Sequence, residues 1–241
     1  GVKEIFSSGN SFAALKEDGS VVTWGESDYG GDSSSVSAKL SFGVKEIFSN
    51  GSGAFAALKD DGSVVTWGSS FAGGDSSSVS SSLSSSVSRI YDNFEGGFAA
   101  FKDDGSVVTW GMHNSVLDSS ILNGFISSQL FSGVKEIFSN HLGFAFLKED
   151  GSVVTWSSDW VDGFNDIVKN QLTSEVKQIV STNNAFAALK EDGSVVTWGY
   201  DVGPEGPNEG FGGDSTSVSD ELSSGVNKLL SADHFFAALK E

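Results

Sequence analysis

The hydrophobic positions of this chain recur in one fixed order. A segment of the type Val-Lys-Glu-Ile-Phe at residues 2–6 is followed by Phe-Ala-Ala-Leu at 12–15 and by Val-Val-Thr-Trp at 21–24. These segments return every 42 to 50 residues along the 241-residue chain. Self-similarity at such a period is typical of propellers, solenoids and other repeat arrays.

Each repeat is predicted to form three strands. The segments are short and rich in β-branched and aromatic residues, which favours strands over helices. An Asp-Gly pair, such as Asp18-Gly19, separates the second segment from the third. Asp-Gly between two apolar segments indicates a tight hairpin, for which we expect a type I′ turn.

The apolar segments do not alternate with polar residues, so the strands are expected to be covered on both faces. Paired alanines in the second strand, such as Ala13-Ala14, leave room for a neighbouring sheet, whereas the tryptophan that ends the third strand fills a wider gap. The sequence therefore predicts an all-β fold, a β-propeller of three-stranded blades with these tryptophans buried between blades.

The connectors between repeats carry their own pattern. Asp32, Val36 and Leu40 are spaced by four residues, and the same spacing follows Asp75 and Asp214. Asp is a good N-cap and an i, i+4 apolar pair shares one face of a helix, so we expect short helical or irregular connectors. An outer fourth strand is the alternative, because steps of four also preserve strand parity.

The repeats predict a single propeller domain over residues 1–241. Five complete repeats start near residues 1, 43, 86, 133 and 175, and a partial sixth covers 225–241. The sixth stops immediately before its Asp-Gly turn, which would leave the strand at 236–240 with an unpaired edge. We therefore expect either that the chain is a segment of a longer polypeptide or that another chain supplies the missing strand.

Charge and composition narrow the partners. With 14 basic and 32 acidic residues, the chain has a formal charge of −18. Such a surface repels phosphate, so neither nucleic-acid binding nor binding to an anionic membrane is expected. There are no cysteines, and the apolar segments are too short for membrane insertion.

The order of the segments resembles the regulator-of-chromosome-condensation (RCC1-like) repeat family. The matching residues are Phe12 to Leu15, Asp18-Gly19, Trp24-Gly25 and Tyr29-Gly30-Gly31, and the resemblance extends over essentially the whole chain. The short repeat looks most like a bacterial branch with three-stranded blades, typified by a secreted β-lactamase inhibitor propeller. Two departures are the lack of Gln after Tyr29-Gly30 and the Ser-rich connectors. Fold resemblance does not by itself carry function.

The side chains suggest no catalytic or metal centre. The three histidines lie in different repeats without ligand spacing, and are interpreted as loop residues. The carboxylate pair before each turn glycine, such as Glu17-Asp18, recurs in every hairpin, so turn chemistry explains it better than catalysis. The connector aspartates, including Asp118, are interpreted as caps rather than calcium ligands. No enzyme activity, cofactor or metal is expected.

Candidate binding residues lie where the repeats lose their symmetry. Trp160 is the only tryptophan outside a third strand, and it is either a binding anchor or packed on its own connector. The fifth connector carries an insertion with Pro204 and Pro207, which is either a recognition loop or a tolerated insertion. The candidate surface comprises Trp160, Tyr200, Phe211, Phe94, His141 and His234.

These observations predict a non-enzymatic protein-interaction or structural propeller of a secreted or surface protein. Its partner would be another protein or the remainder of a larger polypeptide, and its location extracellular or at the cell surface. The alternative is a soluble inhibitor or a carbohydrate-binding propeller that uses loops on one face, in which case a glycan is the ligand.

Overall fold

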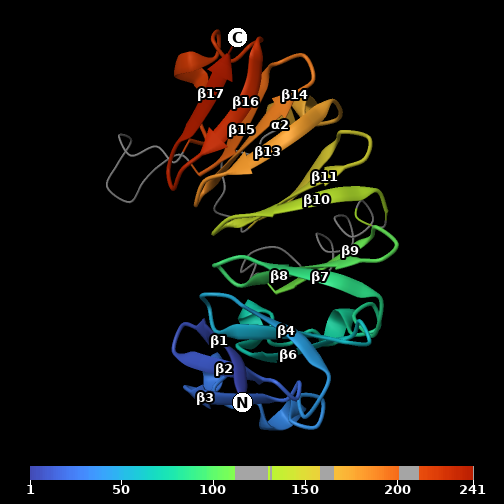
Figure 1. The fold of residues 1–241 in the computed structure, drawn as a ribbon. Coiled ribbons are helices and arrows are strands. Elements are labelled where there is room, and N and C mark those ends of the chain that lie inside the picture. The colour runs from blue at the N-terminus through green and yellow to red at the C-terminus, as the bar shows by residue number, and fades with distance from the viewer. Residues whose placement is uncertain (112–129, 131, 158–165, 201–211, 241) are drawn as a thin grey trace. The chain divides into compact units, whose positions relative to one another are not determined.

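The computed structural model of the chain describes residues 1–111, 130, 132–157, 166–200 and 212–240. Spatial contacts divide it into unit 1, Gly1–Ser132, and unit 2, Gly133–Glu241. In both, every described strand pairs only within a small antiparallel sheet that consecutive strands of one repeat form (Figure 1).

The described residues of unit 1 form three sheets, each with its second strand in the middle. Their strands are β1 (Val2–Ser8), β2 (Ser11–Lys16), β3 (Val21–Gly25), β4 (Val44–Ser49), β5 (Ala54–Lys59), β6 (Val64–Gly68), β7 (Val87–Asp92), β8 (Gly97–Lys102) and β9 (Val107–Gly111).

In the part of unit 2 that the structure describes there are two three-stranded sheets and a two-stranded sheet. Their strands are β10 (Val134–Ser139), β11 (Gly143–Lys148), β12 (Val153–Ser157), β13 (Val176–Ser181), β14 (Ala185–Lys190), β15 (Val195–Gly199), β16 (Val226–Ser231) and β17 (Phe236–Lys240). The predicted all-β fold of three-stranded blades is confirmed. The number of blades in a closed ring, and the single domain, stay predictions.

The Asp-Gly hairpins are not the type I′ turns expected. In the first hairpin Gly19 has a φ of 75°, but Asp18 is not among the described residues with positive φ. The N–H of Gly19 donates to the carbonyl of Lys16 at 3.0 Å, and the N–H of Lys16 donates to the carbonyl of Ser20 at 2.9 Å. This is the three-residue loop in which a left-handed glycine follows a type I turn. Asp18 Oδ1 accepts from the N–H of Ser20 at 3.0 Å, which ties the aspartate to this turn.

The described connectors are short turns of helix, as expected, and contain no outer strand. The helices are η1 (Ser27–Tyr29), η2 (Ser34–Val36), η3 (Ser70–Ala72), η4 (Ser77–Val79), α2 (Asp166–Gln171) and η5 (Thr216–Val218). Asp32 Oδ1 accepts from the N–H of Ser34 at 2.8 Å, so this aspartate holds the first turn of its connector from one residue before the N-cap position, which is Ser33. Asp75 and Asp214 do the same. Asp118 lies outside the described residues.

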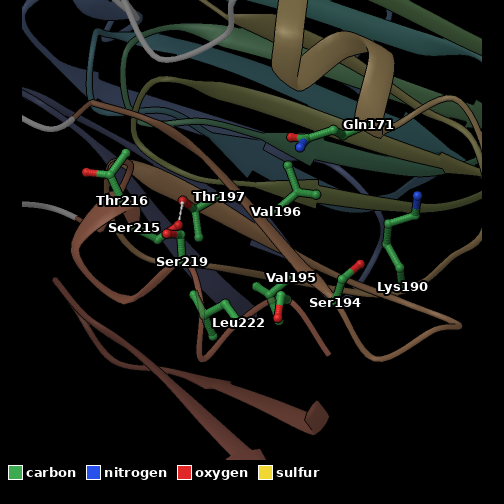
Figure 2. A pocket seen from close by; sticks show the side chains of 11 residues that line it. Gln171, Lys190, Ser194, Val195, Val196, Thr197, Ser215, Thr216, Ser219 and Leu222 are labelled. Carbon is green, nitrogen blue, oxygen red and sulfur yellow. Dashed lines mark hydrogen bonds between the residues drawn. The ribbon is translucent and has the colours of Figure 1, made fainter. Parts of the chain in front are cut away.

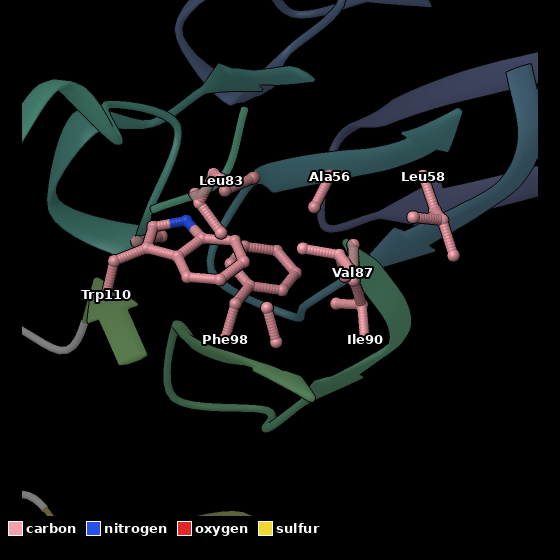
Figure 3. Close-up of a cluster of buried hydrophobic side chains, with 10 residues drawn as sticks. Ala56, Leu58, Leu83, Val87, Ile90, Phe98 and Trp110 are labelled. Atoms are coloured by element: carbon pink, nitrogen blue, oxygen red, sulfur yellow. The ribbon is translucent and has the colours of Figure 1, made fainter. Parts of the chain in front are cut away.

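Consecutive sheets within a unit bury their faces against each other. Between the second and third sheets of unit 1, Leu58 of β5 and Ile90 of β7 belong to one buried cluster, in which Leu83 lies beside the rings of Phe98 and Trp110 (Figure 3). The alanines of β5, Ala54, Ala56 and Ala57, are fully buried. The prediction that small residues allow close approach of sheets covered on both faces is therefore confirmed.

Four of the five third-strand tryptophans are buried, and the prediction is wrong for the fifth. Trp67, Trp110, Trp156 and Trp198 are at most 6% exposed, whereas Trp24 is 43% exposed. Trp67 is covered because the preceding repeat packs on it. Trp24 belongs to the first sheet of the chain, and no described repeat covers that face. No helix among the described residues is long and apolar enough to span a bilayer.

Candidate interaction surface

In unit 1 the loops between first and second strands of successive repeats lie side by side. Ser8 Oγ donates to the carbonyl of Asn50 at 2.5 Å, and Ser52 Oγ donates to the carbonyl of Phe94 at 3.3 Å. The buried amide of Asn50 donates to the carbonyl of Ala72 at 2.8 Å. These bonds join the loops to one another and to a neighbouring connector, so the row of loops is held in a fixed arrangement.

Two aromatic rings lie on the same loop of this row. A Cβ at Gly51 would fall 2.4 Å from the ring of Phe94, and one at Gly53 would fall 2.4 Å from the ring of Tyr29. The glycines therefore let both rings rest directly on the backbone. Phe94, predicted as a binding residue, is 58% exposed and Tyr29 is 37% exposed.

A third aromatic residue, Phe71 in η3, is 67% exposed. Its neighbour Ala72 packs against Gly96, in the loop that also carries Phe94. We call Tyr29, Phe71 and Phe94 the unit 1 aromatic surface. The sequence analysis missed both Tyr29 and Phe71. Tyr29 was interpreted only as part of the resemblance to the repeat family, and Phe71 was missed because no aromatic residue of a connector was expected beside the loops. The signal for Phe71 was a phenylalanine where the first repeat has Asp28.

Asp92, next to this surface, breaks the repeat in a second way. Ser49 and Ser181 occupy the corresponding strand position, and their hydroxyls donate to the carbonyls of Ser7 and Ser139 in the preceding repeat. Burial raises the pKa of Asp92 to about 6. An ionised carboxylate cannot donate such a bond. Only the protonated form of Asp92 can therefore act as a hydrogen-bond donor at this position.

In unit 2 the corresponding loops bring together both predicted histidines and Tyr200. The N–H of His141 donates to the carbonyl of Asn183 at 2.8 Å, and the N–H of Asn183 donates to the carbonyl of Asp233, beside His234, at 2.9 Å. The N–H of Tyr200 donates to the carbonyl of Asn184, in the loop that also carries Asn183, at 2.9 Å. The ring of His234 meets Phe235 edge-on, with centroids 6.3 Å apart.

The other two predicted residues, Trp160 and Phe211, lie outside the described residues, as does the proline-containing insertion. The unit 2 row thus presents His141, His234, Phe235 and Tyr200 from neighbouring loops. Phe235, 67% exposed, was not in the predicted surface.

The turn carboxylates have a structural role, as interpreted from sequence. Asp18 Oδ1 accepts from both the hydroxyl and the N–H of Ser20, and these bonds lower the pKa of Asp18 to about 2. The same serine bonds lower the pKa of Asp61, Asp104, Asp150 and Asp192. Within the ranges that the structure describes, no three His, Asp or Glu side chains are placed to share a metal ion.

A polar cavity of about 380 Å³ lies in the fifth repeat, next to Gln171 of α2 (Figure 2). Its hydroxyl lining is largely structural, because Thr197 Oγ1 donates to Ser215 Oγ at 2.9 Å and to the carbonyl of Gly213. The same threonine–serine pair recurs at Thr23 and Thr66. The hydroxyl pair that lines the cavity is therefore a feature of several repeats, and the lining holds no distinctive set of reactive groups.

Comparison with solved structures finds similar folds at low identity. Yeast RCC1 (Prp20) bound to Kap60 has a TM-score of 0.45 and 15% identity, covering 85% of this chain and 58% of that chain. Human WBSCR16 has a TM-score of 0.44 and 19% identity, covering 83% and 62%. The ectodomain of the Physcomitrella patens receptor kinase CR4 has a TM-score of 0.40 and 13% identity, covering 82% and 50%.

The chain thus spans less than two thirds of each of these structures. RCC1 is the family whose repeat the sequence resembles, and similarity to the bacterial short-repeat branch stays a prediction. At these TM-scores the likeness carries no inference about activity or partner. No family model matches the chain, and no curated protein shows significant similarity to it.

Proposed function

We propose that the chain is a protein-interaction module that binds its partner through the unit 1 aromatic surface without catalysing a reaction. The observation that carries the proposal is the set of three exposed rings: Tyr29 and Phe94 rest on one loop of the row, and Phe71 lies in the connector whose Ala72 packs against that row. Aromatic side chains, phenylalanine included, are enriched at the core of interfaces between proteins.

The fixed arrangement of the loop row supports this proposal. Because the rings of Tyr29 and Phe94 rest on the backbone of residues 51–53, they lose little conformational freedom when a partner covers them. Acidic groups nearby, such as Glu26, which accepts from the Asn10 amide at 2.8 Å, favour a partner with a basic rim. We place the module outside the cell or at its surface, as the Cys-free, acidic, Ser-rich composition suggests.

The proposal is tested by comparing two variants in which exposed phenylalanines are replaced by serine. Phe71→Ser with Phe94→Ser removes two rings of the surface, whereas Phe42→Ser removes a ring that is 65% exposed and lies next to Gly43, at the end of the sheets that carries the Asp-Gly turns. Partners captured from the source organism by the parent chain should be lost with the double variant and kept with Phe42→Ser. Equal capture by all three chains would contradict the proposal.

The alternative, a carbohydrate-binding propeller, rests on the same exposed rings, because aromatic faces also stack on sugars. Binding of the parent chain to an array of immobilised glycans separates the two functions. If the parent chain binds a glycan and the double variant does not, the ligand of this surface is a glycan and not a protein.

A further inference from the structure

Aromatic rings in the described part of the chain have two kinds of partner. Within each three-stranded sheet, the phenylalanine of the second strand stacks on the tryptophan of the third, with ring centroids 5.1 to 5.7 Å apart. Two other rings of unit 1 carry a cation of the same chain. Lys59 Nζ lies 4.6 Å from the centroid of the Phe42 ring, and the guanidinium carbon of Arg89 lies 5.6 Å from that of Tyr91. The negative face of an aromatic ring attracts such a cation.

The segments around the unit 1 aromatic surface carry carboxylates and no basic residue. These segments are the loops and the first connector turns, at residues 7–11, 25–30, 49–54, 68–73 and 92–97. Their sequences contain no lysine, arginine or histidine. The carboxylates of Glu26, Asp28 and Glu95 are exposed there. These segments therefore surround the rings with negative charge, and a positive charge has to come from elsewhere.

The first ring and its carboxylate come from one turn. The N–H of Tyr29 donates to the carbonyl of Glu26 at 3.1 Å, and Ser11 Oγ donates to the carbonyl of Tyr29. The same turn is bound to the first loop, because the N–H of Glu26 donates to the carbonyl of Asn10 at 3.1 Å and Glu26 Oε2 accepts from the Asn10 amide at 2.8 Å. The exposed ring and the exposed carboxylate are thus held close together by the fold itself.

The second ring has a carboxylate beside it in sequence. Phe94 and Glu95 are consecutive exposed residues of the third loop, and Ser52 Oγ donates to the carbonyl of Phe94 at 3.3 Å. A ring with a carboxylate at its side suits a guanidinium group, whose flat face stacks on the ring while its N–H groups pair with the carboxylate. A purely apolar partner would instead cover these carboxylates without pairing them, which is costly.

From these observations we propose that the unit 1 aromatic surface binds a basic polypeptide segment through arginine side chains. One guanidinium stacks on Tyr29 and pairs with Glu26, and a second lies at Phe94 and pairs with Glu95. The inference rests on the proposed function and adds the chemistry of the partner. The formal charge of −18 also attracts a basic segment from a distance, which raises the rate of association.

A library of short random peptides displayed on phage, selected against the immobilised 241-residue chain, tests the chemistry of the partner. We expect the enriched peptides to contain arginine above its frequency in the unselected library, and Asp and Glu below theirs. Enrichment of peptides without excess arginine, or no enrichment at all, would overturn the proposal.

Calorimetry with the most strongly enriched peptide separates the charge of arginine from its shape. Citrulline has the size and the planar end group of arginine but no charge. Replacement of each arginine by citrulline should therefore weaken binding by about tenfold or more. Unchanged binding of the citrulline peptide would exclude a guanidinium as the recognised group.

On the protein side, Glu26→Gln with Glu95→Gln removes both carboxylates and keeps an acceptor for the amide of Asn10. We expect the affinity for the enriched peptide to fall by about fivefold or more. The matched control is Asp60→Asn with Asp103→Asn, which changes the net charge equally. It does so at the Asp-Gly turns, about 17 Å along the strands from the loops, and should leave the affinity within about twofold. Equal weakening by the two double variants would show general charge attraction and contradict a specific site.

Tyr29→Leu keeps an apolar side chain but removes the ring, and should weaken peptide binding by about threefold with little change in melting temperature. An unchanged affinity would exclude stacking on Tyr29. Capture of the natural partner by Phe71→Ser with Phe94→Ser is a separate result. If that variant loses the partner but the selected peptides show no excess of arginine, the proposed function stands and this inference is wrong.

Discussion

The indole nitrogen of Trp67 donates a hydrogen bond of 3.1 Å to the carbonyl of Gly30, in the repeat before its own. Trp110 makes the same bond to Gly73 at 3.0 Å. Each bond joins residues 37 positions apart, so it links the end of one blade to the turn that leaves the preceding blade. The tryptophan is therefore a connection between repeats as well as a filler of the space between them.

Trp67→Ala should destabilise the chain by about 3–5 kcal/mol, because it leaves a cavity in a packed interface and an unsatisfied carbonyl at Gly30. Trp24→Ala should cost about 1–2 kcal/mol, since this side chain is already 43% exposed. Urea unfolding of both variants measures the difference. Equal losses would show that burial against the preceding repeat is not what makes Trp67 important.

Gly30→Ala and Gly43→Ala separate packing from backbone strain. Both glycines have positive φ, 94° and 70°. At Gly43 the nearest atom to a new Cβ is 3.6 Å away, so we expect a loss of about 1 kcal/mol from strain alone. At Gly30 the Cβ would lie 2.7 Å from the ring of Phe55, so the loss should be clearly larger. Thermal melting of the two variants tests which one loses more stability. A larger loss of stability for Gly43→Ala than for Gly30→Ala would contradict the close packing of Phe55 on Gly30.

Acid should weaken the hairpin turns. The folded-state pKa of Asp18 is lowered to about 2, below its value in an unfolded chain, by the hydroxyl and N–H of Ser20. The stabilisation is therefore fully present above about pH 4 and is lost as the pH falls through the folded value near 2. Carbon-detected NMR titration of the Asp18 carboxyl should give a midpoint near 2 in the parent chain. In Ser20→Ala the midpoint should move towards the ordinary value; an unchanged midpoint would exclude the serine as the cause.

Asp92 should impose the opposite pH dependence. Burial raises its pKa to about 6, so the protonated form is favoured in the folded chain. Stability should fall as the pH rises from about 4 through 6, by about 1–2 kcal/mol for this partly exposed group. Asp92→Ser should remove this dependence, because it restores the residue found at Ser49. Melting temperatures of the parent chain and of Asp92→Ser at pH 4.5 and 7.5 check this prediction. If the difference in melting temperature between the two chains is the same at both pH values, the prediction is wrong.

Much of the fold could be predicted because it depends on short, repeated segments. The strands, the close approach at Ala56 and a connector role for aspartates such as Asp32 all followed from local composition. The Phe–Trp stack was missed, although its signal was present: Phe12 and Trp24 are 12 residues apart around a hairpin, as are their counterparts in four later repeats. A constant spacing about a turn places two residues opposite each other.

Other features depended on details that the repeat pattern does not carry. The turn type was wrong because Asp18 and Ser20 bond to each other, which an Asp-Gly pair alone does not reveal. The exposure of Trp24 depends on a neighbouring repeat rather than on its own segment. Of the predicted surface, Phe94 shares one loop with Tyr29 because Gly51 leaves room for the ring of Phe94 and Gly53 for that of Tyr29.

Because Trp67 takes its acceptor from residue 30, the acceptor emerges from the ribosome before the donor. The turn at Gly30 is synthesised and available when the strand that ends in Trp67 appears, so repeats can dock in the order of translation. Each new blade then folds onto a surface that already exists, at a short distance along the chain, and waits for no distant segment. A fault in one blade would correspondingly leave the later ones without a docking surface, and a nascent-chain protease assay would register it as a cleavage-sensitive C-terminal portion.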